Sequence, residues 1–446
     1  MQFRSFLSCR HARAGSGAHR SDADVSKSSA SGGAARLRVV PVFLGLVAAV
    51  LPGAHAAIGA SRPDPARTLS IVLTGQSLIR SDIRVTSPST GPAIEPMLKA
   101  DAVFTNFETT VGEGGETGKG FNAPSFSAPP QAVDALRSLG FNLISLANNH
   151  SWDLRTRGIE NTLRKMTSAE IVHAGVGENL HDAEAPAYLT TPHGTVGLVA
   201  MASGLIAPGA AAAPGRAGVN ELRVEGNGNP DMGDQQRILN RIREAAKHAD
   251  IVVAYHHNHI FPSSADFLMM MNEQLPERLV PPEWVKRWAH REVDAGANVV
   301  VMHGAPLLHG VEIYNGSVIL YDLGNFIFQL PATPPRFEET MCWESVIASV
   351  EFKGRTLHSV TFRPIDVNKG RDDGDRYLAM RGMPAPAAGT HARYILERLA
   401  RLSEPFGMVM RIDGASATIK LGARHDSTGS GTLSAWGARA DHHDQR

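Results

Sequence analysis

The sequence predicts an α/β protein built around a mostly parallel β-sheet. Short apolar runs alternate with helical segments at the spacing of βαβ units. Polar residues directly follow several of these runs, as at the carboxyl ends of strands in open α/β sheets. The chain has 446 residues, 43% of them apolar, so one large domain or two ordinary ones would fit.

The first 56 residues are organised like a secretory signal behind a long leader. Two arginines precede an apolar run at 39–51, and Ala54 to Ala56 form an A-x-A cleavage pattern. The run is too short to span a bilayer comfortably, so we expect cleavage after Ala56, with an uncleaved membrane anchor as the alternative. Residues 57–67 would be a linker. The mature chain is expected outside the inner membrane, in the periplasm or at the cell surface.

Composition excludes several classes of function. Lys+Arg and Asp+Glu balance at 44 each, and aromatic residues make up 6%, so neither a basic face nor stacking platforms for nucleic acid are expected. The two cysteines are Cys9 and Cys342. Once the leader is removed, Cys342 is alone, which excludes an intramolecular disulfide and a thiolate metal site.

The predicted strands are short apolar runs, and the predicted helices lie between them. Gly140 ends the first helix, and Trp284 and Trp288 lie four residues apart on one face of the last. The predicted strands cover residues 68–74, 102–106, 143–147, 171–175, 196–201, 251–255, 298–302 and 318–321. The predicted helices cover residues 131–139, 154–166, 235–249 and 284–295.

The remaining segments are less regular. Residues 111–130 are rich in Gly, Pro and Ser and predict a loop. Residues 204–233 predict a mobile excursion from the core, and 260–281 an insertion. Residues 345–367 alternate apolar and polar side chains, which predicts antiparallel strands at a sheet edge. The domain is expected to end near residue 412, followed by a polar tail that is disordered towards its end.

Unusual polar residues stand at five predicted strand ends. Because the carboxyl ends of strands in an open α/β sheet share one edge, residues far apart in sequence can converge there. Imidazole, amide and carboxylate groups are ligands for a divalent ion such as Zn, Mn or Fe. The residues concerned are Gln76, Asn106, Glu108, Asn148, Asn149, His150, His256, His257, His259 and His303.

Each of these residues also has a structural interpretation. A single histidine at a strand end is more often a hydrogen-bonded structural residue than a ligand. Asn148 and Asn149 could cap the helix at 154–166, and Glu108 alone could be solvated. The histidine cluster is harder to dismiss, because strand alternation would place His257 and His259 on one face.

The ordered set of motifs resembles the CapA family of poly-γ-glutamate capsule biosynthesis proteins, in the metallophosphatase-like (calcineurin-like) superfamily. The resemblance covers residues 68–412. Its carriers are ADAVFTNFET (100–109), GFNLISLANNHSWD (140–153), HAGVG (173–177), ADIVVAYHHNH (249–259) and DAGANVVVMHGAPLLHGVEIYNGSVILYDLGNFIF (294–328). It implies a four-layer α/β/β/α sandwich of the metallophosphatase-like type. It also implies a divalent-metal site and a role in making, attaching or trimming a surface polymer.

The resemblance also assigns roles to individual residues. It implies that Asn149 and His257 bind metal and that His150 contacts the substrate. Asn106 and Glu108 match the site residues of the second strand, and His303 matches a late metal-binding histidine. Two positions depart from the family pattern: Gln76 replaces an acidic residue, and Pro306 replaces a second late histidine. The number of metal ions, one or two, stays open.

Three functions compete at this stage. The first is a secreted metal-assisted hydrolase or transferase that acts on a phosphoester or a γ-glutamyl amide, with His150, Asn149 and Glu108 as catalytic residues. The second is a non-catalytic component that binds or exports an acidic polymer, in contact with capsule-assembly membrane proteins. The third is a purely structural module. The sequence indicates neither the polymer nor the oligomeric state.

Overall fold

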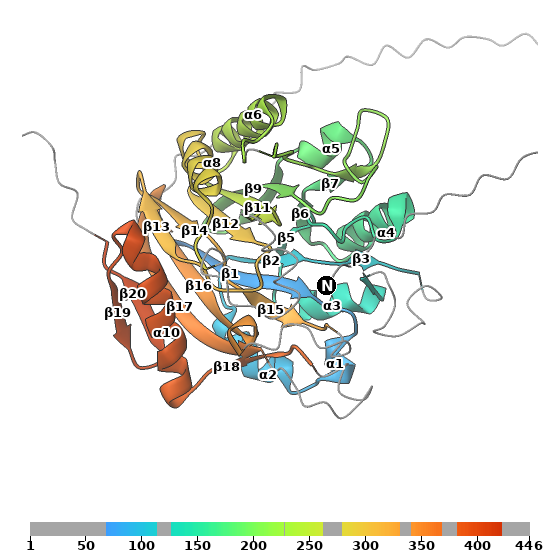
Figure 1. Cartoon of the computed structure of the whole chain (residues 1–446). Coiled ribbons are helices and arrows are strands. Elements are labelled where there is room, and N and C mark those ends of the chain that lie inside the picture. The colour runs from blue at the N-terminus through green and yellow to red at the C-terminus, as the bar shows by residue number, and fades with distance from the viewer. Residues whose placement is uncertain are drawn as a thin grey trace, which may run out of the picture. The chain divides into compact units, whose positions relative to one another are not determined.

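The computed structural model describes residues 68–113, 126–226, 228–261, 279–330, 340–367 and 381–421. The predicted leader and signal (1–56) and linker (57–67) lie outside the described residues. Two β-sheets lie face to face, with helices packed against their outer sides (Figure 1). This is the predicted four-layer α/β/β/α sandwich. None of the helices in these ranges is long and apolar enough to cross a membrane.

The first sheet has ten strands and a parallel half that carries site residues. Its strand order is β19-β20-β17-β16-β1-β2-β5-β6, with β15 paired to β1 and β18 paired to β17. The parallel strands are β1 (Thr68–Leu78), β2 (Ala102–Phe107), β5 (Leu143–Ser145), β6 (Val172–Ala174) and β15 (Asn325–Phe328). The antiparallel strands are β16 (Glu344–Lys353), β17 (Thr356–Val367), β18 (Pro384–Pro386), β19 (Met410–Asp413) and β20 (Ser416–Ile419).

The second sheet has six strands in the order β13-β14-β12-β11-β9-β8. Its central strands are parallel: β9 (Gly194–Ser203), β11 (Ile251–Asn258), β12 (Val299–His303) and β14 (Ser317–Leu320). The outer strands β8 (Ala187–Thr191) and β13 (Val311–Tyr314) are antiparallel to their neighbours. Two small ladders join β3 (Thr110–Val111) to β4 (Ser127–Ala128) and β7 (Val176–Gly177) to β10 (Gly218–Val219).

Alternation along β11 shows how the layers form. Val253 and Tyr255 face the core between the two sheets, where the ring of Tyr255 lies 5.5 Å from that of Phe104 on β2. Val252 and Ala254 face the opposite side and pack in the core that includes Trp288. Both faces of this strand are therefore buried, which explains its nearly continuous apolar sequence.

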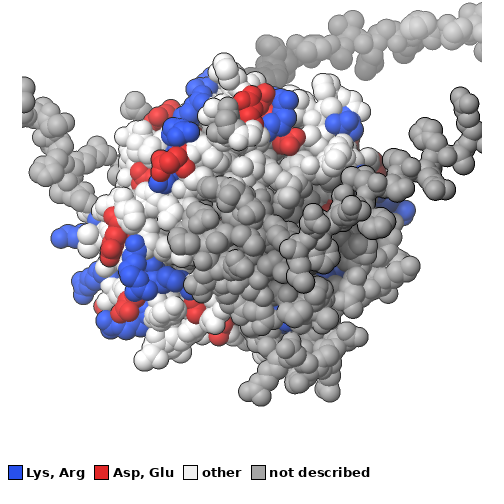
Figure 2. Space-filling model, in the orientation of Figure 1, with Lys and Arg blue, Asp and Glu red and all other residues white. Residues whose placement is uncertain are grey.

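Helices complete the outer layers. On the outer face of the six-stranded sheet lie α6 (Met232–His248) and α8 (Glu283–Asp294). The other helices in the described ranges are α1 (Ile83–Thr86), α2 (Thr90–Ile94), α3 (Pro130–Ser138), α4 (Arg155–Ser168), α5 (Leu180–Glu184) and α10 (Gly389–Ser403). Figure 2 shows basic and acidic side chains next to one another on the described surface, in the same orientation. Short 3-10 turns cover Glu95–Met97, Thr340–Trp343 and Glu404–Phe406. Buried residues of α3 and α10 join the larger core.

The structure corrects three expectations. Residues 204–233 are not an excursion, since Val219 and Leu222 are buried in the cores. The segment 111–130 is not only loop, because its described ends form β3 and β4. The sheet also continues past residue 412, because β20 pairs with β17. The strands β19 and β20 do alternate apolar and polar residues, but each has only four residues, which is too short a pattern to predict a strand.

Candidate metal centre

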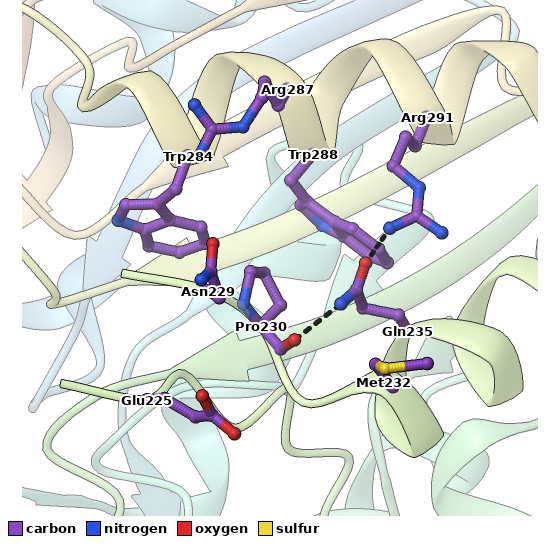
Figure 3. Close-up of a pocket in the computed structure, with 9 residues that line it drawn as sticks. All are labelled: Glu225, Asn229, Pro230, Met232, Gln235, Trp284, Arg287, Trp288 and Arg291. Carbon is purple, nitrogen blue, oxygen red and sulfur yellow. Dashed lines mark hydrogen bonds between the residues drawn. The ribbon is translucent and has the colours of Figure 1, made fainter. Parts of the chain in front are cut away.

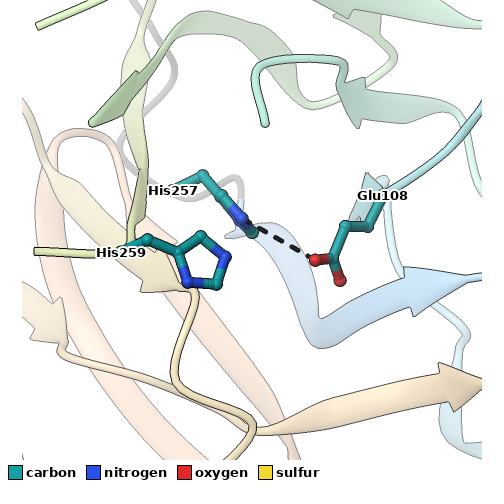
Figure 4. A group of neighbouring side chains, drawn as sticks. All are labelled: Glu108, His257 and His259. Carbon is teal, nitrogen blue, oxygen red and sulfur yellow. Dashed lines mark ion pairs between the residues drawn. The ribbon is translucent and has the colours of Figure 1, made fainter. Parts of the chain in front are cut away.

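Glu108, Asn149, His257 and His259 converge from three separate segments of the chain. Glu108 follows β2, Asn149 lies in the turn after β5, and the two histidines lie at the end of β11 and just beyond it. Ligand atoms of Glu108, His257 and His259 all lie within 4.8 Å of one another (Figure 4). His257 Nε2 lies 2.9 Å from Asn149 Oδ1 and 3.8 Å from Glu108 Oε1.

These separations are close to those expected around a shared divalent ion. Two ligand atoms that each lie about 2.1 Å from one ion, at tetrahedral or octahedral angles, are separated by about 3.0–3.5 Å. The two distances around His257 Nε2 fall on either side of that range. Glu108 Oε2 and His259 Nε2 are buried and have no hydrogen-bond partner among the described residues. Buried polar atoms are normally satisfied, so these two point to a missing ligand.

Burial controls the protonation of this group. Burial raises the pKa of Glu108 to about 7; His150 opposes the rise and Asp153 adds to it. Burial also holds the pKa of His257 well below its usual range, and that of His303 at about 3. The imidazoles are therefore neutral at pH 7, which is the form that binds metal.

The orientation of His257 is set by its neighbours on the inner face. Tyr255 Oη lies 3.2 Å from His257 Nδ1, and Asn106 Nδ2 lies 3.5 Å from it. Coordination through Nε2 requires the proton on Nδ1, where the tyrosine oxygen can accept it. Such partners of the second nitrogen fix the tautomer and direction of a ligating histidine.

Asn148 shapes the turn that carries Asn149 and His150. Its Nδ2 donates to Asn106 Oδ1 (3.1 Å) and to the carbonyl of Phe107 (2.8 Å), and its Oδ1 accepts from the backbone N–H of His150 (3.0 Å). The alternative in which Asn148 and Asn149 cap the next helix is wrong. That helix, α4, begins after Leu154 and has no side-chain cap.

His150 is held beside this group by two contacts. Its Nδ1 lies 3.0 Å from Asp153 Oδ2, which also accepts the backbone N–H of Phe126 (2.6 Å). The ring of Phe126 lies 4.2 Å from the imidazole. Because Asp153 accepts a hydrogen bond from the N–H at Nδ1, the second nitrogen, Nε2, is left available for a substrate.

Gln76 and His303 flank the group without belonging to its closest set. Gln76 Nε2 donates to Asn325 Oδ1 (3.0 Å), and its buried Oε1 has no partner among the described residues. Register pairs Gln76 with Asn106 across β1 and β2, and His257 with His303 across β11 and β12. Paired residues share a face of the sheet, so both lie on the side of the site.

The site draws on both sheets, not on the edge of one sheet as the strand pattern predicted. Gln76, Asn106 and the Asn149 turn belong to the ten-stranded sheet, and the histidines of β11 and β12 to the six-stranded one. Gly304 allows the backbone that follows β12 to pass close to the backbone at the end of β11. It has a φ of +131°, and a Cβ there would lie 1.9 Å from the carbonyl oxygen of Asn258.

His256, by contrast, does not join the site. It faces the outer side of β11, where its Nε2 lies 2.9 Å from Ser203 Oγ and its ring lies 5.9 Å from that of Trp284. This is the structural role that the sequence left open for a single histidine.

Three residues near the site were missed by sequence reasoning. Tyr255 could have been found from its position two residues before His257 on the same strand face. Asp153 could have been found because a carboxylate three residues after His150 is close enough in the chain to contact the imidazole. Asp322 could have been found as the polar residue that directly follows the predicted strand 318–321. It is buried after β14, accepts the N–H of Gly324 (2.7 Å), and has a pKa well above its usual range, mainly through burial and partly through Glu108.

The four-layer sandwich brings carboxylate, amide and imidazole groups together between its sheets, as in a protein that holds a divalent ion. Comparison with known families is more specific. The family described as "Bacterial capsule synthesis protein PGA_cap" matches residues 70–330. The chain belongs to this capsule synthesis family.

The chain is also similar to individual proteins. An uncharacterized protein of Sinorhizobium fredii is 30% identical over 75% of this chain and 89% of its own length. The PGA biosynthesis protein CapA of Bacillus subtilis is 26% identical over 62% of this chain and 64% of its own. Among solved structures, a phosphatase of Mycoplasma pneumoniae covers 67% of this chain and 94% of its own, with 10% identity and a TM-score of 0.39.

Proposed function

We propose that this protein is a metal-dependent hydrolase or transferase that acts on a poly-γ-glutamate-type surface polymer outside the inner membrane. The observation that carries the proposal is the convergence of Glu108, Asn149, His257 and His259 on one buried point. Membership of the capsule synthesis family and the name of the Bacillus subtilis relative support the polymer as its target. Capsule-assembly membrane proteins are its expected partners.

Different residues of the site would bind the metal and contact the substrate. A divalent ion of the Mn, Zn or Fe type would supply Lewis-acid chemistry at the scissile group. Glu108, Asn149, His257 and His259 would hold it, while Tyr255 keeps His257 in position. His150, oriented by Asp153 through its Nδ1–H, presents the lone pair of Nε2 to a proton of the substrate or of the attacking nucleophile.

Gln76 favours a second candidate, a protein that binds the polymer without cutting it. Gln76 brings a neutral amide where the family pattern has an acidic residue, and Pro306 cannot serve as a ligand. A site with fewer anionic ligands holds fewer cations. A single ion could then serve to hold carboxylates of the polymer.

Metal content tests the proposal. We expect close to one equivalent of a transition metal in the supplemented wild-type protein, and its loss in His257→Ala and Asn149→Ala. His358→Ala, which removes an exposed histidine from β17, is the matched control. A content below about a tenth of an equivalent in the wild type would overturn the metal site.

Polymer assays separate the two candidates. If the wild type binds metal and cleaves a phosphoester or a γ-glutamyl peptide, the enzyme is supported. If it binds metal and the polymer but cleaves neither, the binding protein is supported. If the two variants lose metal and polymer production is unchanged, the site is not the functional centre.

A further inference from the structure

A pocket lies on the outer side of the six-stranded sheet, which faces away from the metal centre. It has a volume of about 450 Å³ and opens between α8 and the loop that leads into α6 (Figure 3). Its wall includes Trp284, whose indole packs against His256 on the outer face of β11. None of its lining residues is a proposed metal ligand, so the pocket is separate from the metal centre.

Two guanidinium groups stand along one side of the pocket. Arg287 and Arg291 are four residues apart on α8, so they lie one above the other on the same helix face. Arg291 donates through Nη1 to Gln235 Oε1, and Gln235 Nε2 donates to the carbonyl of Pro230 (2.5 Å). This chain of bonds orients one guanidinium, while Arg287 makes no hydrogen bond to any described residue. Guanidinium forks are suited to carboxylates.

The rest of the lining is mostly apolar. Trp284, Trp288 and Pro230 form the wall between the arginines and the loop, and Met232 is 83% exposed at the rim. Glu225 is the acidic residue of the lining, and it stands on the opposite side from the two arginines (Figure 3). Two positive charges against one negative charge leave a net charge of +1 on the lining.

The wall opposite α8 is preformed by a tight turn. The N–H of Glu225 donates to the carbonyl of Asn229 (2.9 Å), and the N–H of Gly228 donates to the carbonyl of Glu225 (2.8 Å). Gly228 has a φ of +77°, and a Cβ at this position would meet Trp284 at 3.4 Å. The positive φ therefore favours glycine in this turn, and its backbone lies in van der Waals contact range of the indole.

We propose that this pocket binds a carboxylate-bearing ligand with a short apolar stem. Arg287 and Arg291 take the carboxylates, and the stem lies along Trp284 and Pro230. A free dicarboxylic acid and the acidic residues of a polymer both offer this chemistry. The pocket stands independently of the proposed hydrolase.

Calorimetric titration of the full chain with glutarate tests the proposal, with the neutral diamide glutaramide as a matched ligand. We expect saturable binding of glutarate and none of glutaramide. Arg287→Gln combined with Arg291→Gln should weaken binding by at least about tenfold, because charge-assisted hydrogen bonds are lost. Arg243→Gln, which removes an exposed arginine of α6 outside the pocket, should leave the affinity unchanged.

A γ-glutamyl trimer, titrated in parallel, distinguishes the source of the ligand. Tighter binding of the trimer than of glutarate identifies a polymer site, and equal binding identifies a site for a small acid. The His257→Ala variant should keep its glutarate affinity, which separates this test from that of the hydrolase. If the double glutamine variant unfolds, the double lysine variant replaces it and should bind more weakly, since it keeps the charge and loses the fork.

Two results would overturn the proposal. One is the absence of saturable binding of either acid up to about 10 mM. The other is binding that the folded double variant retains in full.

Discussion

The hydroxyl of Tyr255 lies 3.2 Å from Nδ1 of His257, two residues further along β11. Strand alternation places both side chains on the face that looks into the space between the sheets. The contact leaves the other imidazole nitrogen directed at Asn149 and Glu108. A residue that would otherwise be a buried aromatic of the core therefore orients a candidate ligand.

Tyr255→Phe should lower metal affinity by about 10- to 100-fold, because His257 loses the acceptor that fixes its tautomer. The phenyl ring still packs against Phe104, so the melting temperature should change little. Metal titration with a competing chelator measures the affinity. Tyr188→Phe, on β8, is the control, and an unchanged affinity for Tyr255→Phe would show that the hydroxyl does not support the ligand.

Gln76→Asp should raise metal affinity, since it adds an anionic group next to Asn106 on the face of the site. The metal-free protein should become less stable, because the new carboxylate is buried. Added metal should therefore raise the melting temperature more in this variant than in the wild type. Gln76→Asn changes the length without adding charge, and an equal response of both variants would place residue 76 outside the site.

Asp153→Asn should move the proton of His150 from Nδ1 to Nε2, because the amide N–H now faces Nδ1. Nitrogen chemical shifts measured by NMR report the tautomer. Turnover of a phosphoester or γ-glutamyl substrate should fall on the order of 10²-fold while metal content stays constant. Loss of metal in this variant would instead mean that Asp153 supports the ligands.

Glu292→Gln should change how stability depends on pH. Glu292 is fully buried in α8, and burial holds its pKa well above the usual 4.5, with Trp288 offsetting part of the rise. As pH rises above 4.5, the unfolded chain releases a proton that the folded chain keeps, so the wild type loses up to about 1.4 kcal/mol of unfolding free energy per pH unit. This loss stops once pH passes the folded-state pKa.

The glutamine variant has no such proton, so its stability relative to the wild type should increase from pH 5 towards pH 7, by up to about 1.4 kcal/mol per pH unit. Urea unfolding at several pH values measures the difference. Glu283→Gln is the control on the same helix. Glu283 is exposed and its pKa is lowered by Lys286, so its removal should not produce the increase. A pH-independent difference for Glu292→Gln would contradict the prediction.

The sequence predicted the strands well where they are buried on both faces. Ile251 to Tyr255 forms part of a central parallel strand, as expected, and the placement of His257 near His259 followed from alternation. The strands after residue 380 were not predicted. Strands such as Met410–Asp413 are half-exposed and short, and they have no continuous apolar run to reveal them.

The site was predicted as residue types but not as a geometry. Strand ends identified Glu108, Asn149 and His257, yet nothing local shows that His257 belongs to a different sheet from Glu108. Which face a residue occupies at the end of a strand depends on where the strand ends. Here β11 continues to Asn258, beyond the predicted residue 255, and carries His256 and His257 within the ladder.

His256 and His257 are consecutive on β11 but open onto different compartments, one against Trp284 of the arginine-lined pocket and the other towards Glu108. Because side chains alternate with a period of two, inserting or deleting a single residue upstream in this strand would exchange the two histidines between the compartments. The metal centre would lose His257, and Trp284 would lose its contact with His256, in one step. We therefore expect β11 to tolerate substitutions of single residues but not insertions or deletions, because only a constant length keeps His257 on the side of the metal centre.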